Sequence, residues 1–185
     1  MIKRNFWSLI MIMCWSLTGI GQDNGFGLKM GGSMVFVALD SWDDQSSALG
    51  FNAGAYYHYS LHEGVRLQGE LLYAQEGYEV VNAIQSTNVM TRFLDMNLVP
   101  KYFWKDALFV EGLIGYGIAL STAYEIVYRS GETVKGDEGF DDALHFGLGI
   151  GYEFKNAFCL NMRWQHRLVE RGDWNNLQLG AAYTF

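Results

Sequence analysis

The most constraining feature of this chain is an alternation of apolar and polar side chains that recurs eight times after Gly25. Successive side chains of a β-strand point to opposite faces, so a period of two predicts strands with one apolar face. The apolar faces begin at Phe26, Phe51, Val65, Leu94, Leu108, Leu144, Phe158 and Leu177. Each segment is about 10–13 residues long, the length that a tilted strand needs to cross a bilayer. The chain is therefore predicted to be all-β.

The predicted connections differ in length in a regular order. Longer, polar connections are expected at residues 39–48, 79–91, 122–141 and 168–173, and short turns between them at 60–64, 104–106 and 155–156. Outer-membrane barrels have short periplasmic turns and longer outer loops. We therefore expect an eight-stranded antiparallel up-and-down transmembrane β-barrel over residues 22–185.

The apolar faces carry no charged residue, whereas the opposite faces carry many. Five basic and five acidic residues alternate to the inside: Lys29, Arg66, Glu70, Glu76, Asp95, Lys101, Glu111, Glu153, Arg163 and Arg167. An eight-stranded barrel is just wide enough for side chains to fill. Because an unpaired charge in such a space is costly, the inward charges are predicted to form an ionic network that fills the lumen.

The expected turns also predict a register for this network. Folding about residues 79–91 places Glu70 across from position 100, beside Lys101. Folding about residues 104–106 places Lys101 across from Phe109, diagonal to Glu111. Cross-strand and diagonal neighbours are within reach of long side chains. Glu70, Lys101 and Glu111 are thus expected to form a cluster, neutralised by Arg66 or Arg163.

The N-terminus has the three parts of a secretory signal peptide. Lys3 and Arg4 precede an apolar stretch over residues 6–20, and small residues stand at Gly19 and Gly21. We predict a signal peptide at residues 1–21, cleaved near Gly21. Cys14 follows Met13 rather than a small residue, which disfavours a lipoprotein signal. The formal charge of −7 argues against nucleic acid as a partner.

Aromatic residues gather near both ends of the predicted strands, for example Tyr152 and Phe154 at one end and Trp164 and Trp174 at the other. Membrane barrels carry such girdles at both interfaces, whereas a soluble β-sandwich has no need for them there. Tyr183 and Phe185 face outward on the closing strand, and we interpret them as a C-terminal assembly signal read by the barrel-assembly machinery. A simple girdle position explains the same two residues.

Five stretches resemble the PorT-like β-barrel family of Gram-negative outer-membrane proteins. They are GLKMGGS at 27–33, ELLYAQEGY at 70–78, MNLVPKYF at 96–103, GLGIGYEF at 147–154 and QLGAAYTF at 178–185. In this chain Pro100 stands next to Lys101, whereas members often carry the proline nearer the acidic residue of that strand. The resemblance implies an outer-membrane location in contact with membrane lipid and lipopolysaccharide. It also implies, for part of the family, an accessory role in protein secretion.

Residues that would carry chemistry are few. His58, His62, His145 and His166 lack metal-ligand spacing, and a solvated loop explains the acidic run 137–142 more simply than a calcium site. The sequence His58-Tyr59-Ser60 resembles the His-x-Ser of barrel lipid hydrolases but falls at the periplasmic rim.

We therefore expect no enzyme, cofactor or metal. The predicted function is a non-enzymatic barrel with a structural or surface-interaction role. The alternative is an accessory of secretion or surface assembly that contacts secretion-system or surface proteins. A solute pore and a lipid-modifying enzyme are the less favoured readings.

Overall fold

The computed structural model describes residues 24–38, 45–81, 84–105, 107–139, 141–169 and 172–185. The predicted signal peptide at residues 1–21 lies outside these ranges, so its cleavage stays a prediction. Among the described residues, no helix is long and apolar enough to cross a membrane.

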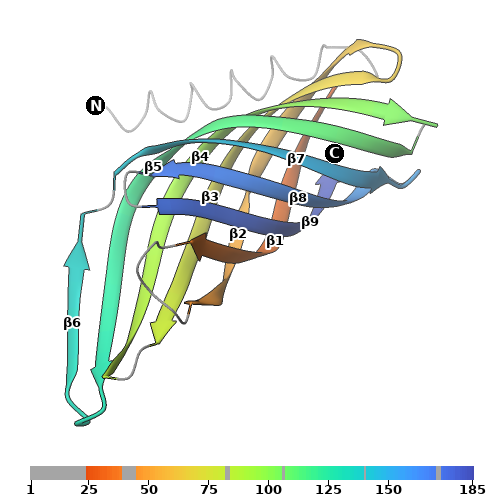
Figure 1. The fold of residues 1–185 in the computed structure, drawn as a ribbon. Helices are drawn as coiled ribbons and strands as arrows, with labels where there is room; N and C mark the ends of the chain where they lie inside the picture. The colour runs from red at the N-terminus through yellow and green to blue at the C-terminus, as the bar shows by residue number, and fades with distance from the viewer. Residues whose placement is uncertain (1–23, 39–44, 82–83, 106, 140, 170–171) are drawn as a thin grey trace, which may run out of the picture.

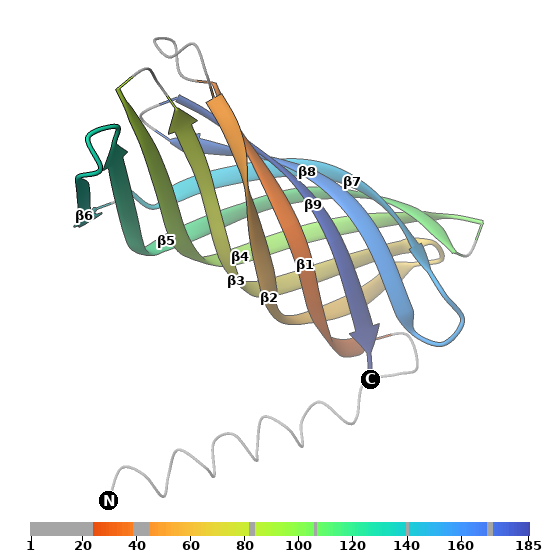
Figure 2. The same cartoon turned by 90° about the horizontal axis from the view of Figure 1, so that it is seen from below.

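The described residues form nine β-strands, and eight of them close a ring (Figures 1 and 2). The strands are β1 (Gly25–Ala38), β2 (Gln45–His62), β3 (Val65–Val81), β4 (Gln85–Trp104), β5 (Leu108–Tyr128), β6 (Thr133–Glu138), β7 (Ala143–Glu153), β8 (Phe158–Val169) and β9 (Gly172–Thr184). Each strand of the ring pairs antiparallel with its neighbours in the chain, and β1 closes on β9. The predicted eight-stranded antiparallel up-and-down fold is confirmed.

The ninth strand, β6, continues the line of β7 along the same edge of β5. β5 pairs with β7 as far as Gly117 with Ala143, and with β6 from Thr122 with Glu138 onward. Both chains advance by five residues across the interruption, so β6 and β7 are two parts of one broken strand. The carboxylate of Asp142 lies at the break, where it accepts hydrogen bonds from the backbone N–H of Ala119 and the hydroxyl of Tyr116.

Two of the expected long loops are strand over most of their length. β3 and β4 remain paired up to Val81 with Ser86, within the connection expected at 79–91. Most of the connection expected at 122–141 is likewise strand, in β5 and β6. Figure 2 shows these extensions leaving the ring at the end opposite the C-terminus. We call this the long-hairpin end, and the other, with the C-terminus and the turns after β2, β4 and β7, the short-turn end.

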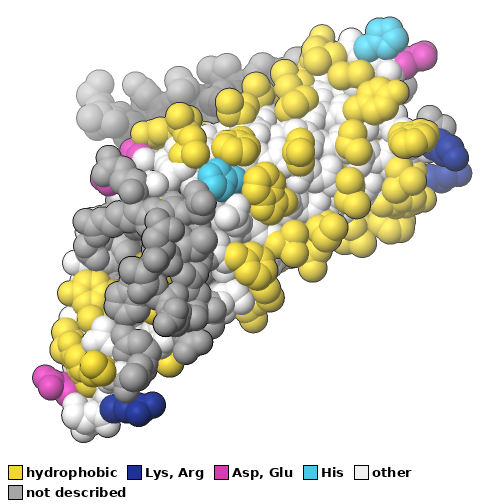
Figure 3. Space-filling view, viewed as in Figure 1, with side chains coloured by type: hydrophobic (Ala, Val, Ile, Leu, Met, Phe, Trp, Pro, Cys, Tyr) yellow, Lys and Arg dark blue, Asp and Glu magenta, His cyan; other side chains and the backbone are white. Residues whose placement is uncertain are grey.

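The alternation in the sequence separates two environments on the wall of the barrel. Outward side chains are apolar and exposed, as for Leu28, Leu148 and Leu179, while the charged residues between them point inward and are buried. Figure 3 shows hydrophobic side chains covering one face of the outer wall. The polar core of the molecule is therefore the lumen, and the apolar surface is the outside of the ring.

Candidate functional site: the charged lumen

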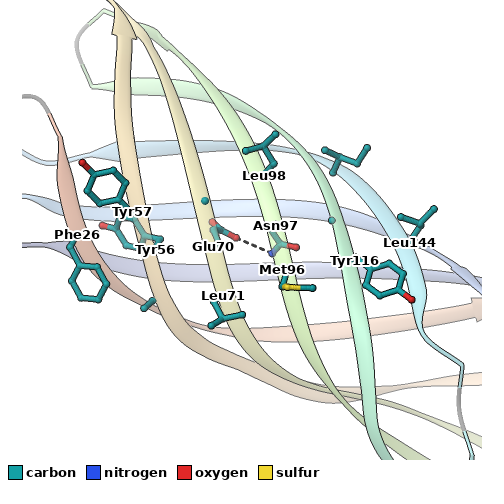
Figure 4. A pocket seen from close by; sticks show the side chains of 14 residues that line it. Phe26, Tyr56, Tyr57, Glu70, Leu71, Met96, Asn97, Leu98, Tyr116 and Leu144 are labelled. Carbon is teal, nitrogen blue, oxygen red and sulfur yellow. Dashed lines mark hydrogen bonds between the residues drawn. The ribbon is translucent and has the colours of Figure 1, made fainter. Parts of the chain in front are cut away.

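The first of two ionic layers in the lumen is built around the carboxylate of Glu70 on β3. Nη1 and Nη2 of Arg163, on β8, donate to its two oxygens at 2.9 and 3.0 Å. Nζ of Lys29 lies 3.0 Å from Oε1, and the side-chain amides of Gln68 and Asn97 donate at 2.7 and 3.1 Å. Figure 4 shows the bond between Asn97 and Glu70 on neighbouring strands. Five donors thus share one buried carboxylate.

Arg163 also reaches a second carboxylate, that of Glu111 on β5. Its Nε donates to Oε1 at 2.9 Å, and the amide of Asn161 donates to the same oxygen at 2.8 Å. Nζ of Lys101 lies 3.7 Å from Oε2 of Glu111 and 4.6 Å from the ring centroid of Phe109. One guanidinium therefore ties β3 to β5 across the lumen from β8.

The second layer lies nearer the long-hairpin end and is built around Arg167. Its Nη1 and Nη2 donate to both oxygens of Asp95 at 3.1 Å, and Nη2 also donates to Glu76 at 3.1 Å. The guanidinium lies 3.9 Å from the ring centroid of Phe93, a cation–π contact. A Cβ at Gly117 would lie 2.1 Å from Nη1 of Arg167, so only glycine leaves room for this arginine.

A neutral pair connects the two layers. Nη1 of Arg167 donates to Nδ1 of His145 at 3.2 Å, which leaves Nε2–H of His145 to donate to Oδ1 of Asn97 at 2.7 Å. Asn97 in turn donates to Glu70. Hydrogen bonds therefore run without interruption from Arg167 to Glu70.

The charges of the two layers balance. The first layer holds Lys29, Lys101 and Arg163 against Glu70 and Glu111, an excess of one positive charge. The second holds Arg167 against Glu76 and Asp95, an excess of one negative charge. All eight side chains are buried, and the two arginines are each 1 % exposed. Burial of this kind is tolerated because every charge has a partner.

Two residues predicted for this network lie apart from it. Arg66 and Glu153 face each other at the short-turn end, 2.6 Å apart and with 28 % and 27 % of their side chains exposed. The guanidinium of Arg66 lies 4.4 Å from the ring centroid of Phe103. Among the described residues, neither makes an ion pair with the two layers. Of the two residues expected to neutralise the cluster, Arg163 pairs with Glu70 and Glu111, whereas Arg66 pairs with Glu153 at the mouth of the barrel.

The register also differs from the expected one. Glu70 lies across from Asn97 rather than position 100, because the β3–β4 hairpin is centred earlier in the chain than the middle of residues 79–91. Lys101 lies directly across from Glu111 rather than diagonal to it. Glu70 and Lys101 are joined through Arg163 and Glu111, and not directly.

Apolar side chains lie beyond the layers at both ends. At the short-turn end Tyr56, Phe109, Cys159 and Ala182 form a buried cluster, with Phe103 against it. At the long-hairpin end Val35, Phe93 and Trp174 are buried, and the ring of Tyr78 meets that of Trp174 edge-on at 5.4 Å. Trp174 was expected in the outer girdle, but it points inward and closes the lumen.

Sequence reasoning missed the neutral members of the network. They are Gln68, Asn97, His145, Asn161 and Asn176, and each of them forms a hydrogen bond with a charged residue of the lumen. Asn97 and His145 also bond to each other and so link the two layers. All five alternate inward with the charged residues, so the period of two was the signal that could have found them.

The other residues singled out in the sequence lie outside the network. His58 is buried at the short-turn end and stacks on Tyr56. Tyr183 and Phe185 are exposed on the outer wall with their rings 5.5 Å apart, and their role in assembly stays a prediction. Within the described part of the chain, no three His, Cys, Asp or Glu side chains are grouped to hold a metal ion.

Comparison with known proteins places this geometry in a family. A family model described as "Outer membrane protein beta-barrel domain" matches residues 8–185. The crystal structure of Ail, the attachment invasion locus protein of Yersinia pestis, is similar with a TM-score of 0.61 and 15 % identity, covering 89 % of this chain and 100 % of that one. Neisserial surface protein A is similar with a TM-score of 0.51 and 10 % identity, covering 86 % and 97 %.

A second structure of Ail, in complex with the heparin analogue sucrose octasulfate, is similar with a TM-score of 0.59 and 16 % identity, covering 89 % of this chain and 100 % of that one. No curated protein matches the sequence. At these identities the solved structures support the fold alone, while the family model covers nearly the whole chain. The chain therefore belongs to the outer-membrane β-barrel domain family, and it resides in the outer membrane of a Gram-negative bacterium.

Proposed function

We propose that this protein is a closed, non-enzymatic barrel that anchors in the outer membrane and presents its long-hairpin end at the cell surface. The observation that carries the proposal is the pair of salt bridges from Arg163 to Glu70 and Glu111, which crosses the lumen. Together with the second layer, it occupies the path that a solute would take.

The energetics of the lumen support a closed state. A passing ion would have to break ion pairs between buried charges, and leaving one such charge unpaired costs about 3–5 kcal/mol. Two layers and two apolar ends stand in series along the same path. A hydrated pore would instead keep its charges individually solvated.

Planar-bilayer recording tests this closure. We expect the unmodified protein to show no steady conductance, after its fold has been checked by the different gel mobility of unheated and boiled samples. The double variant Glu70→Ala/Arg163→Ala is the matched control, because it removes one charge of each sign from the first layer and enlarges the lumen. We expect it to stay closed as well, because the second layer and the two apolar ends still block the path. A steady, ion-selective pore in the unmodified protein would contradict the proposal.

The orientation is supported by the lengths of the connections. The turns at the short-turn end span only the few residues between β2 and β3, β4 and β5, and β7 and β8, while β3–β4 and β5–β6 extend at the other end. Short turns face the periplasm in this class of barrel. An epitope tag inserted at Gly131 should be reached by antibody on intact cells, and one at residues 155–156 should not. The reverse labelling would refute the orientation.

A second candidate is an accessory role in protein secretion or surface assembly. It rests on the PorT-like motifs at residues 70–78 and 96–103, which include Glu70, Asn97 and Lys101 of the lumen. Extraction in mild detergent separates the two candidates. A secretion accessory should co-purify with a defined set of envelope proteins in fixed proportion, whereas the barrel proposed above should be recovered with lipid and lipopolysaccharide alone.

A further inference from the structure

A polar pair interrupts the apolar outer wall near the long-hairpin end. His166 on β8 and Asn175 on β9 are cross-strand partners. Their sequence neighbours Gln165, Arg167 and Asn176 are buried in the lumen at 1 % exposure, so alternation places His166 and Asn175 on the outer wall. Polar side chains on a lipid-facing surface are costly and mark functional positions.

Aromatic rings flank this pair. The ring of His166 stacks on that of Trp164 at 6.1 Å and 23°, and lies 5.1 Å from that of Phe146. Phe146 is the cross-strand partner of His166 on β7. Trp164 is 41 % exposed and Phe146 is 45 % exposed, so both rings keep surface available to a ligand. We call these four residues the outer-wall patch.

The hydrogen bond within the pair fixes what it can offer to a ligand. Nδ1 of His166 lies 3.1 Å from Oδ1 of Asn175, and since the carbonyl oxygen accepts, Nδ1–H donates. The neutral imidazole then presents Nε2 as an acceptor, and the amide of Asn175 presents N–H donors. A hydroxyl group both donates and accepts, so it can bond to both residues at once. A phosphate oxygen only accepts, and it meets one donor.

The height of the patch on the barrel places it at a headgroup layer. His166 stands eight residues above Phe158, which faces outward at the short-turn end. At ~3.3 Å per residue and a tilt of ~40°, this is about 20 Å along the membrane normal, in an apolar band about 25 Å tall. The patch thus lies about 5 Å below the far interface, within reach of the head of a lipid in that leaflet.

We propose that the outer-wall patch binds the sugar head of an outer-leaflet glycolipid. A sugar hydroxyl donates to Nε2 of His166 and accepts from Nδ2 of Asn175, while the apolar face of the sugar ring packs on Trp164. The inference goes beyond the proposed function because it does not depend on a closed lumen. It depends on the orientation, which the tag at Gly131 tests separately.

The test measures lipid retention by native mass spectrometry of the full barrel released from detergent. The probes are a neutral monoglucosyl diacylglycerol and phosphatidylcholine with the same acyl chains, because the phosphatidylcholine head has phosphate oxygens but no hydroxyl. His166→Phe keeps the stacked ring and removes the acceptor, and Asn175→Leu removes the donor. Met162→Leu, an outward change lower on the same strand, is the matched control. Unheated gel mobility checks that each variant is folded.

We expect the unmodified protein and Met162→Leu to retain one glucosyl lipid in preference to phosphatidylcholine. Each polar variant should bind it about tenfold more weakly, as expected for one lost hydrogen bond to a ligand and the partner left exposed to lipid. Equal retention of the two lipids by the unmodified protein would overturn the proposal. Unchanged retention of the glucosyl lipid by both polar variants would overturn it as well.

Discussion

Replacing Arg163 with alanine is the most direct perturbation of the charged lumen. The change removes three donors, two to Glu70 and one to Glu111, from a side chain that is 1 % exposed. Lys29 still faces Glu70, and Lys101 still faces Glu111. The net charge of the first layer then falls from +1 to zero. The net charge of −1 on the second layer is no longer balanced.

The expected loss in the free energy of unfolding is about 3–5 kcal/mol, the cost of breaking a buried ion pair by removing one partner. Arg163→Lys keeps the charge but cannot bond to two carboxylates through three nitrogens, so we expect a smaller loss. Arg66→Ala is the matched control, because its pair with Glu153 is partly exposed. Such pairs contribute about 0–1 kcal/mol.

Denaturant titration of the protein in lipid vesicles, followed by the gel mobility of the unheated sample, measures these differences. The order of stability should be unmodified protein, then Arg66→Ala, then Arg163→Lys, with Arg163→Ala last. If Arg163→Ala unfolds within about 1 kcal/mol of Arg66→Ala, the lumen is hydrated and its charges are individually solvated. That result would refute a closed lumen.

Three further predictions concern other parts of the wall. Gly117→Ala should lower stability by about 1–3 kcal/mol, because its Cβ would displace the guanidinium of the second layer, whereas Gly69→Ala meets no atom within 4 Å and should leave the thermal midpoint unchanged. Deleting Phe185 should lower the amount of heat-modifiable protein in the outer membrane, and equal amounts would argue for a plain girdle residue. Asp142→Ala should speed hydrogen exchange at the amide of Ala119 while exchange elsewhere in β5 stays slow; unaltered protection there would show that the carboxylate does not hold the break.

The period of two identified the strands inside the membrane because lipid and lumen impose opposite chemistry on neighbouring residues. Lys29, Glu70 and Arg163 could be placed inside from that period alone. Beyond the membrane the same strands meet water on both faces, so residues 85–88, Gln-Ser-Thr-Asn, carry no contrast between faces and were expected to be loop. These strand extensions were not predicted because their two faces are equally polar, and not because their backbone is unusual.

The predicted register was derived from the expected positions of the turns, and it was wrong where those positions were wrong. A hairpin centred on residues 79–91 moves the partner of Glu70 from Asn97 to position 100, a shift of three residues. The alternation of side chains could not predict which residues pair between distant strands, because no local feature of the sequence relates Arg163 on β8 to Glu70 on β3. The composition of the lumen was predictable, but the pairs within it required the closed ring.

The strands that supply the first ionic layer set the order in which this barrel can form. Lys29 comes from β1, Glu70 from β3 and Arg163 from β8, and the two partners of the central salt bridge stand 93 residues apart in the chain. Contacts so distant form late, because the chain must first close a long loop. A partly built sheet therefore holds these charges wet and unpaired, and lateral closure of β1 on β9 is the step at which water leaves the lumen. The ion pairs of the first layer should accordingly form together, in the step that closes β1 on β9.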